Sequence, residues 1–243
     1  MRIRIRYRKL GKIRFTSHRD VARCWERAFR TSGIPVASTE GFSPRPKMHF
    51  GLALSTSHES LGEYLDLDLR DPESGDVDLD GLCDLLSSHL PDGIDVEAVA
   101  VIDRSEPSLQ ESVTSCTWQI DVPGVTSVEL LEAVDGLLAA PTLPVIRERK
   151  GRPVSDDLRP GILHLAVLDA DPDADGAPGA VLYAELATQP RSVRPSELMA
   201  AFDPPLTEGR VRRINQFITE DGATREPLPQ GAPSMALTTV RAI

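Results

Sequence analysis

The sequence predicts an α+β protein built from two ferredoxin-like (split βαβ) domains in tandem. Short segments with alternating apolar side chains predict strands, and amphipathic segments between them predict helices. The order strand–helix–strand–strand–helix–strand occurs clearly once and then recurs more weakly. A chain of 243 residues is long enough for two such domains. We place the domains at residues 1–105 and 115–220, followed by a flexible tail over residues 221–243 that is rich in Pro, Gly and Ala.

The first domain begins with a strand in which arginines alternate with apolar residues, RIRIRYR. The apolar residues are expected to face the core, because successive side chains of a strand point to opposite faces of its sheet. The other face carries what we call the arginine row: Arg2, Arg4, Arg6 and Arg8. KIRF continues the alternation after a turn at Gly11, which predicts a hairpin or a bent strand.

A basic amphipathic helix follows over residues 20–32. Ser17 is a suitable capping residue, and Gly33 is a suitable stop. Apolar residues share one face of the helix. The opposite face is basic and carries Arg19, Arg23, Arg27 and Arg30, joined by Glu26. His18 falls toward the apolar side by helical angle, so we expect a buried, hydrogen-bonded histidine.

The remaining elements follow from the same two periodicities. In the first domain we expect a short strand near Val36, strands over 48–54, 63–69 and 94–102, and a helix over 79–90. Residues 103–114 are a polar linker. In the second domain we expect strands over 116–122, 143–149, 162–168, 181–187 and 211–218, and helices over 127–139 and 194–202.

Charge is unevenly distributed along the chain. The net charge is −10, yet residues 1–50 contain 13 Lys and Arg side chains against three Asp and Glu. Such asymmetry predicts a polyanion-binding region on an acidic body. The alternative is that the basic segment pairs with acidic residues of the same chain. In particular, Asp66 and Asp68 of GEYLDLDL are expected to lie beside the arginine row and to neutralise part of it.

The stretch GFSPRPKMHFG, residues 41–51, is the most distinctive candidate site. Two prolines restrict the backbone around Arg45 and precede Lys47, so both cations are held in a stiff loop. The loop either contacts a phosphate backbone or only carries the chain across the sheet edge. The predicted RNA contacts are Arg19, Arg23, Arg27, Phe42, Ser43, Arg45, Lys47, His49, Arg191 and Arg194.

Several protein classes are not expected. Cys24, Cys83 and Cys116 are far apart, which predicts single buried thiols instead of a disulfide framework, a zinc ribbon or an iron–sulfur site. We therefore expect no metal and no cofactor. No apolar run approaches the ~18 residues needed to span a membrane, and the N-terminus lacks a signal-peptide core. The default location is cytoplasmic, without membrane attachment.

A family resemblance rests on these same motifs. The segment from KLGKIRFTSHRD through GFSPRPKMHFGLAL, followed by GEYLDLDL, resembles the radical SAM-linked family, a domain of unknown function (DUF2344). The resemblance is close over residues 1–105 and thinner afterwards, in DLRPGILHL and SVRPSELMAAF. It implies an accessory partner of a separately encoded radical SAM protein, in a setting of ribosome or RNA maturation. It supplies no catalytic residues.

We therefore predict a non-catalytic accessory protein that binds RNA or presents a substrate to a radical SAM enzyme. Two alternatives remain open. The first is a metal-independent endoribonuclease, by analogy with the tandem ferredoxin-like endonucleases that process CRISPR repeats, with His18 as the acid or base. The second is a protein–protein adaptor that docks an acidic partner through the basic surface.

Overall fold

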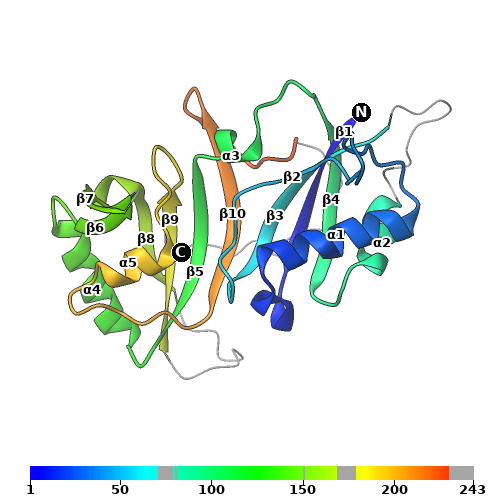
Figure 1. Cartoon of the computed structure of the whole chain (residues 1–243). Coiled ribbons are helices and arrows are strands. Elements are labelled where there is room, and N and C mark those ends of the chain that lie inside the picture. The colour runs from blue at the N-terminus through cyan, green and yellow to red at the C-terminus, as the bar shows by residue number, and fades with distance from the viewer. Residues whose placement is uncertain (71–78, 80, 150, 169–178, 230–243) are drawn as a thin grey trace. The chain divides into compact units, whose positions relative to one another are not determined.

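The structure is a computed structural model that describes residues 1–70, 79, 81–149, 151–168 and 179–229 (Figure 1). It combines antiparallel strands with a few helices, so the predicted mixture of both element types is confirmed. The chain divides into two compact units. Residues 1–112 and the segment that begins at Arg225 form the first unit, and residues 113–224 form the second.

The first unit contains most of the distinctive motifs. Its elements are β1 (Arg2–Lys9), η1 (Gly11–Phe15), α1 (His18–Ser32), β2 (Met48–Phe50), β3 (Glu59–Asp68), α2 (Leu82–His89), β4 (Ile94–Ile102) and α3 (Leu109–Ser112). The strands are antiparallel in the order β4-β1-β3-β2. Helices α1 and α2 cover one face of this sheet (Figure 1). The core between them includes Ile5, Trp25 and Leu65, which are fully buried.

Two segments of the first unit depart from the alternating pattern. KIRF forms the 3-10 helix η1 and not the expected strand, because Gly11 takes a left-handed φ of 73° and turns the chain. The Lys9 ammonium donates to the carbonyl oxygens of Arg14 and Thr16, each at 3.2 Å, and so stabilises this turn. The predicted strand over 48–54 is only three residues long, since its pairing with β3 ends at Phe50.

The second unit also combines strands and helices. Its elements are β5 (Ser115–Pro123), α4 (Ser127–Ala139), β6 (Pro144–Arg149), β7 (Arg152–Asp157), η2 (Arg159–Gly161), β8 (Ile162–Leu168), β9 (Gly179–Ala187), α5 (Pro195–Ala200) and β10 (Val211–Glu220). The main strands pair antiparallel in the order β10-β5-β9-β8, and β6 and β7 form a separate hairpin. Strand β7 was not predicted, because RPVSDD is largely polar and has no apolar alternation.

Within the predicted tail over 221–243, residues 221–229 are described, and they include β11 (Ala223–Arg225). Cys116 is buried, whereas Cys24 and Cys83 are only partly buried, so the prediction of buried thiols is correct for Cys116 alone. All three are free thiols, in agreement with their wide separation in the sequence.

Candidate nucleic-acid interface

The arginine row is neutralised by acidic side chains of neighbouring strands. Pairing between β1 and β3 places Arg2 opposite Asp68 and Arg4 opposite Asp66. Arg4 donates to both carboxylate oxygens of Asp66, from Nε at 2.7 Å and from Nη2 at 2.9 Å. Arg2 Nε donates to Asp68 at 2.6 Å. The expected neutralisation by Asp66 and Asp68 is confirmed.

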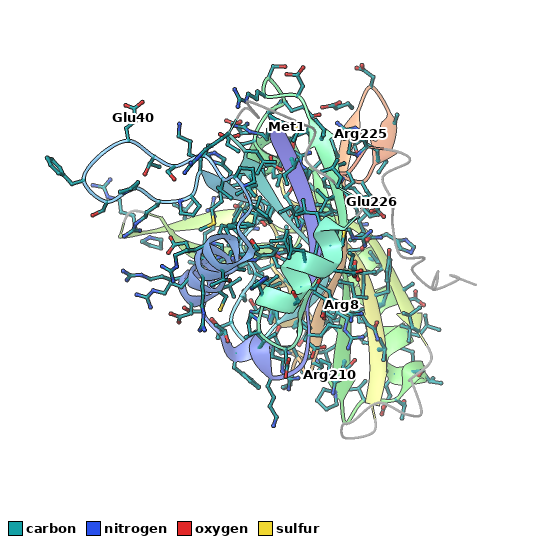
Figure 2. The ribbon with its side chains drawn as sticks, turned by 90° about the vertical axis from the view of Figure 1, so that its right-hand side faces the viewer. Met1, Arg8, Glu40, Arg210, Arg225 and Glu226 are labelled. Atoms are coloured by element: carbon teal, nitrogen blue, oxygen red, sulfur yellow. The ribbon has the colours of Figure 1, made fainter. Side chains whose placement is uncertain are left out.

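The segment after β11 covers the same row from the side opposite α1 (Figure 2). Arg6 Nη1 donates to the Glu226 carboxylate at 3.0 Å, and Tyr64 donates its hydroxyl to that carboxylate at 3.3 Å. Arg4 Nη1 donates to the carbonyl oxygen of Pro227 at 2.9 Å. Arg4 and Arg6 are therefore only 0% and 3% exposed. These two central arginines of the row do not form an open phosphate-binding face.

The Arg2–Asp68 pair makes the stability of the first unit depend on pH. The hydrogen bond from Arg2 is the main reason that the pKa of Asp68 lies below its ordinary value, and partial burial opposes it. A carboxyl group whose pKa is lowered by folding contributes stability above its unfolded pKa of about 3.9. That contribution is lost as the pH falls through the pKa of the folded state.

We expect the native protein to lose more stability on acidification below about pH 4 than an Asp68→Asn variant does. The measurement is the urea midpoint of unfolding between pH 7 and pH 3 for both proteins. Asp92→Asn, at an exposed carboxyl in the turn before β4, is the control. Identical pH slopes for the native protein and Asp68→Asn would contradict the assignment.

Exposed basic side chains are found outside the arginine row, over residues 10–50. Seven cationic side chains there are exposed: Lys12, Arg19, Arg23, Arg27, Arg30, Arg45 and Lys47. The same stretch contains three carboxylates, Asp20, Glu26 and Glu40. Arg23 Nη1 contacts Asp20 at 2.8 Å, but both side chains are more than half exposed, and such surface pairs contribute little to stability. This surface keeps a net positive charge.

Four of these cations form what we call the arginine stripe of α1. The helix begins after Ser17, whose hydroxyl accepts a hydrogen bond from the Asp20 amide, and it ends at Gly33 in a left-handed conformation. Val21, Trp25, Ala28 and Phe29 face the sheet. The stripe lies on the opposite side and consists of Arg19, Arg23, Arg27 and Arg30. Arg30 was predicted on this face but was not among the predicted RNA contacts.

The proline-rich loop is an ordered ribbon. Lys47 N–H donates to the Ala37 carbonyl and Thr39 N–H donates to the Arg45 carbonyl, each at 2.8 Å. The Arg45 N–H in turn donates to Thr39 Oγ1 at 3.1 Å. We call residues 37–47 the 37–47 ribbon. Figure 2 shows it, marked by Glu40, projecting from the first unit on the same side of the sheet as α1.

The ribbon exposes several of the predicted contact residues. The Phe42 side chain at the tip is fully exposed, at 110% of the reference value. Ser43, Arg45 and Lys47 are exposed as well. His49 lies opposite Asp66 in β3, and its charge helps to lower the pKa of Asp68. His49 therefore belongs to the sheet face that carries the arginine row and not to the side that carries α1.

The predicted contacts in the second unit differ in exposure. The Arg191 guanidinium contacts Asp156 at 3.1 Å and also pairs with Glu197. Asp156 accepts from Arg147 as well, at 3.0 Å. Arg191 therefore connects the β6–β7 hairpin to α5. Arg194 precedes α5 and is exposed.

His18 is exposed, so the expectation of a buried, hydrogen-bonded histidine is wrong. As the first residue of α1 it lies beyond the part of the helix that packs on the core, and its ring contacts the edge of Phe50 in β2 at 4.9 Å between centroids. Among the residues that the structure describes, no group of three or more His, Cys, Asp or Glu side chains is placed to hold a metal ion. No helix in the described ranges is long and apolar enough to cross a membrane.

A comparison of the sequence with protein families gives a match. The family described as an uncharacterized protein conserved in bacteria (DUF2344) matches residues 2–195, which is most of the chain. The match spans β1, the arginine stripe, the 37–47 ribbon and most of the second unit. A comparison with curated proteins gives no match.

Proposed function

The chain belongs to the DUF2344 family, and we propose that it is a non-catalytic RNA-binding protein. The binding surface is the arginine stripe of α1 together with the 37–47 ribbon. One observation carries this proposal: after the arginine row has been neutralised internally, the remaining exposed cations of residues 10–50 are concentrated on these two elements and the adjoining η1.

The geometry of the arginine stripe suits a phosphate backbone. Neighbouring arginines in the stripe are separated by three or four residues, a rise of about 4.5–6 Å along the helix axis. Each guanidinium offers a planar set of donors that matches phosphate oxygens. Long side chains that are exposed to solvent can reach successive phosphates without a large desolvation cost. Arg45 and Lys47 on the ribbon add further cationic contacts.

The accessory role follows from the family resemblance. We propose that the chain presents bound RNA to a separately encoded radical SAM enzyme. The iron–sulfur cluster and the radical chemistry belong to that partner, because the three cysteines of this chain lack cluster spacing. The role of this chain is then to grip and orient the RNA.

We also propose that both units are ferredoxin-like domains. The supporting observation is a shared strand order: β4-β1-β3-β2 in the first unit corresponds to β10-β5-β9-β8 in the second. In each unit the first and third strands are central, and helices follow the first and third strands. The β6–β7 hairpin is then an insertion between α4 and β8.

The direct test is binding of the purified chain to total cellular RNA across a salt series. We expect affinity to fall steeply with salt, because phosphate contacts release counterions. Removing the stripe by Arg19→Ala, Arg23→Ala, Arg27→Ala and Arg30→Ala is expected to reduce the slope of log affinity against log salt by about 3. The pair Arg45→Ala and Lys47→Ala is expected to reduce it by about 1.5.

Arg152→Ala is the matched control, because Arg152 is an exposed arginine in β7, outside the proposed surface. It is expected to leave the slope unchanged. No binding at low salt, or equal losses for Arg152→Ala and Arg45→Ala, would overturn the proposal. Cleavage of the bound RNA that disappears in His18→Ala would favour the endoribonuclease. Retention of an acidic protein in place of RNA would favour the adaptor.

A further inference from the structure

Phe42 differs from an ordinary exposed apolar residue in its position. Single hydrophobic side chains on a surface are common and need no functional explanation. Phe42, however, lies at the tip of the 37–47 ribbon, between its two paired arms, and its entire side chain is exposed. Two exposed cations, Arg45 and Lys47, follow it along the ribbon.

The ribbon holds Phe42 in a defined place before any ligand binds. Backbone hydrogen bonds join Thr39 to Arg45 and Ala37 to Lys47, so both arms of the ribbon are paired. Pro44 and Pro46 restrict the backbone of the returning arm. Little conformational freedom then remains to be lost on binding, and preorganisation of this kind increases affinity.

The tip is also open to a flat ligand. The neighbours of Phe42 are Gly41 and Ser43, which are among the smallest residues. Gly41 takes a φ of 125°, a conformation that favours glycine, and a Cβ built at this position would meet nothing within 4 Å. A planar ring can therefore approach Phe42 without meeting a bulky neighbouring side chain. Arg45 is exposed close by in the chain and suits the phosphate of an adjacent nucleotide.

Building on the proposed RNA binding, we infer that Phe42 stacks on an unpaired base, so that the substrate is single-stranded RNA or an RNA loop or bulge. Bases within an A-form duplex are stacked on each other, and the deep, narrow major groove does not admit side chains. An unpaired base presents its face to an aromatic ring, and this contact tolerates any base. The arginine stripe then follows the backbone while Phe42 selects unpaired nucleotides.

The test compares three RNAs in fluorescence anisotropy titrations at one salt concentration. They are a single-stranded 20-nucleotide RNA, the same RNA annealed to its complement, and a hairpin with an unpaired loop. We expect the full chain to bind the single strand and the hairpin more tightly than the duplex. Phe42→Ala is expected to weaken binding to the single strand by about 5- to 150-fold, the range measured for loss of one stacked base.

Two further variants separate stacking from other effects. Phe42→Trp is expected to keep the affinity, because it keeps an aromatic face, whereas Phe42→Leu keeps an apolar side chain without that face and is expected to behave like Phe42→Ala. Phe15→Ala is the control, because Phe15 is another exposed aromatic residue of the first unit, in η1. The salt slope is expected to stay unchanged in all Phe42 variants, since no cation is removed.

The outcomes separate this inference from the proposed function. If the duplex binds as tightly as the single strand, or if Phe42→Ala binds like the native chain, the inference is wrong while salt-dependent RNA binding stands. If none of the three RNAs binds at low salt, both are wrong. Because the Phe42 side chain is fully exposed, its variants are expected to have the same melting temperature as the native chain. A thermal melt of each variant checks this.

Discussion

Arg4→Ala is expected to lower the free energy of unfolding of the first unit by about 3–5 kcal/mol. Arg4 is completely buried, and its guanidinium donates to both oxygens of Asp66 and to the Pro227 carbonyl. Removing the arginine leaves a buried carboxylate and a buried carbonyl oxygen without these donors. An uncompensated charge in the interior is among the most destabilising changes that a single substitution can make.

The two tryptophans of the chain allow this effect to be measured by unit. Trp25 lies in the first unit and Trp118 in the second, so a Trp118→Phe background leaves a fluorescence signal from the first unit alone. Urea unfolding of Arg4→Ala in this background gives its change in stability. Arg19→Ala, at an exposed arginine, is the control and is expected to stay within about 0.5 kcal/mol of the parent.

A double replacement tests the physical reason. Arg4→Met with Asp66→Leu removes both charges and keeps apolar volume, so it is expected to be far less destabilising than Arg4→Ala and close to neutral. If Arg4→Ala cost no more than Arg19→Ala, the buried ion pair would not contribute as described. If the double variant were as unstable as Arg4→Ala, shape and not charge would be the cause.

Trp25→Ala is expected to destabilise the first unit by about 3–5 kcal/mol. Trp25 is completely buried, and its ring contacts those of Tyr7 at 5.0 Å and Phe29 at 5.3 Å between centroids. Alanine would leave a large cavity between α1 and the sheet. The arginine stripe depends on this packing, because Trp25 lies on the opposite side of the same helix.

Trp25→Phe is the matched comparison. It keeps an aromatic ring and removes the indole N–H, which is buried and makes no hydrogen bond within the described part of the chain. We expect it to cost clearly less than Trp25→Ala. Urea unfolding followed by circular dichroism gives both values, and the RNA affinity of Trp25→Ala is expected to fall as its folded fraction falls. Equal stabilities for the native chain and Trp25→Ala would contradict this account of the core.

Local pattern was sufficient for most elements of the fold. Period-two alternation predicted β1 and β4, and the apolar face with Ser17 and Gly33 predicted α1, because these signals lie within one element. The pattern failed where a few residues determine the local path. Gly11 turns the chain, so the alternating segment after it forms η1 and not a strand. Strand β7 is largely polar and lacks the apolar alternation by which a strand is predicted.

The candidate site was also predicted only in part. The spacing of Arg19, Arg23 and Arg27 predicted a basic helix face, and the prolines around Arg45 predicted a stiff loop. The sequence did not predict that this loop is a hydrogen-bonded ribbon with Phe42 at its tip. Ser, Pro and Gly are typical of irregular loops as well.

By itself, the sequence determined which residues of this protein alternate, which cap a helix and which share a helix face, because those properties depend on neighbours along the chain. Only the tertiary structure decided which cations are available to a ligand. Arg4 meets Asp66 across 62 residues of chain, and Arg6 meets Glu226 across 220. Strand alternation specifies the face on which an arginine lies, but pairing over such separations depends on strand order and on the path of the C-terminal segment. Those long-range contacts bury Arg4 and Arg6, whereas the arginine stripe stays exposed.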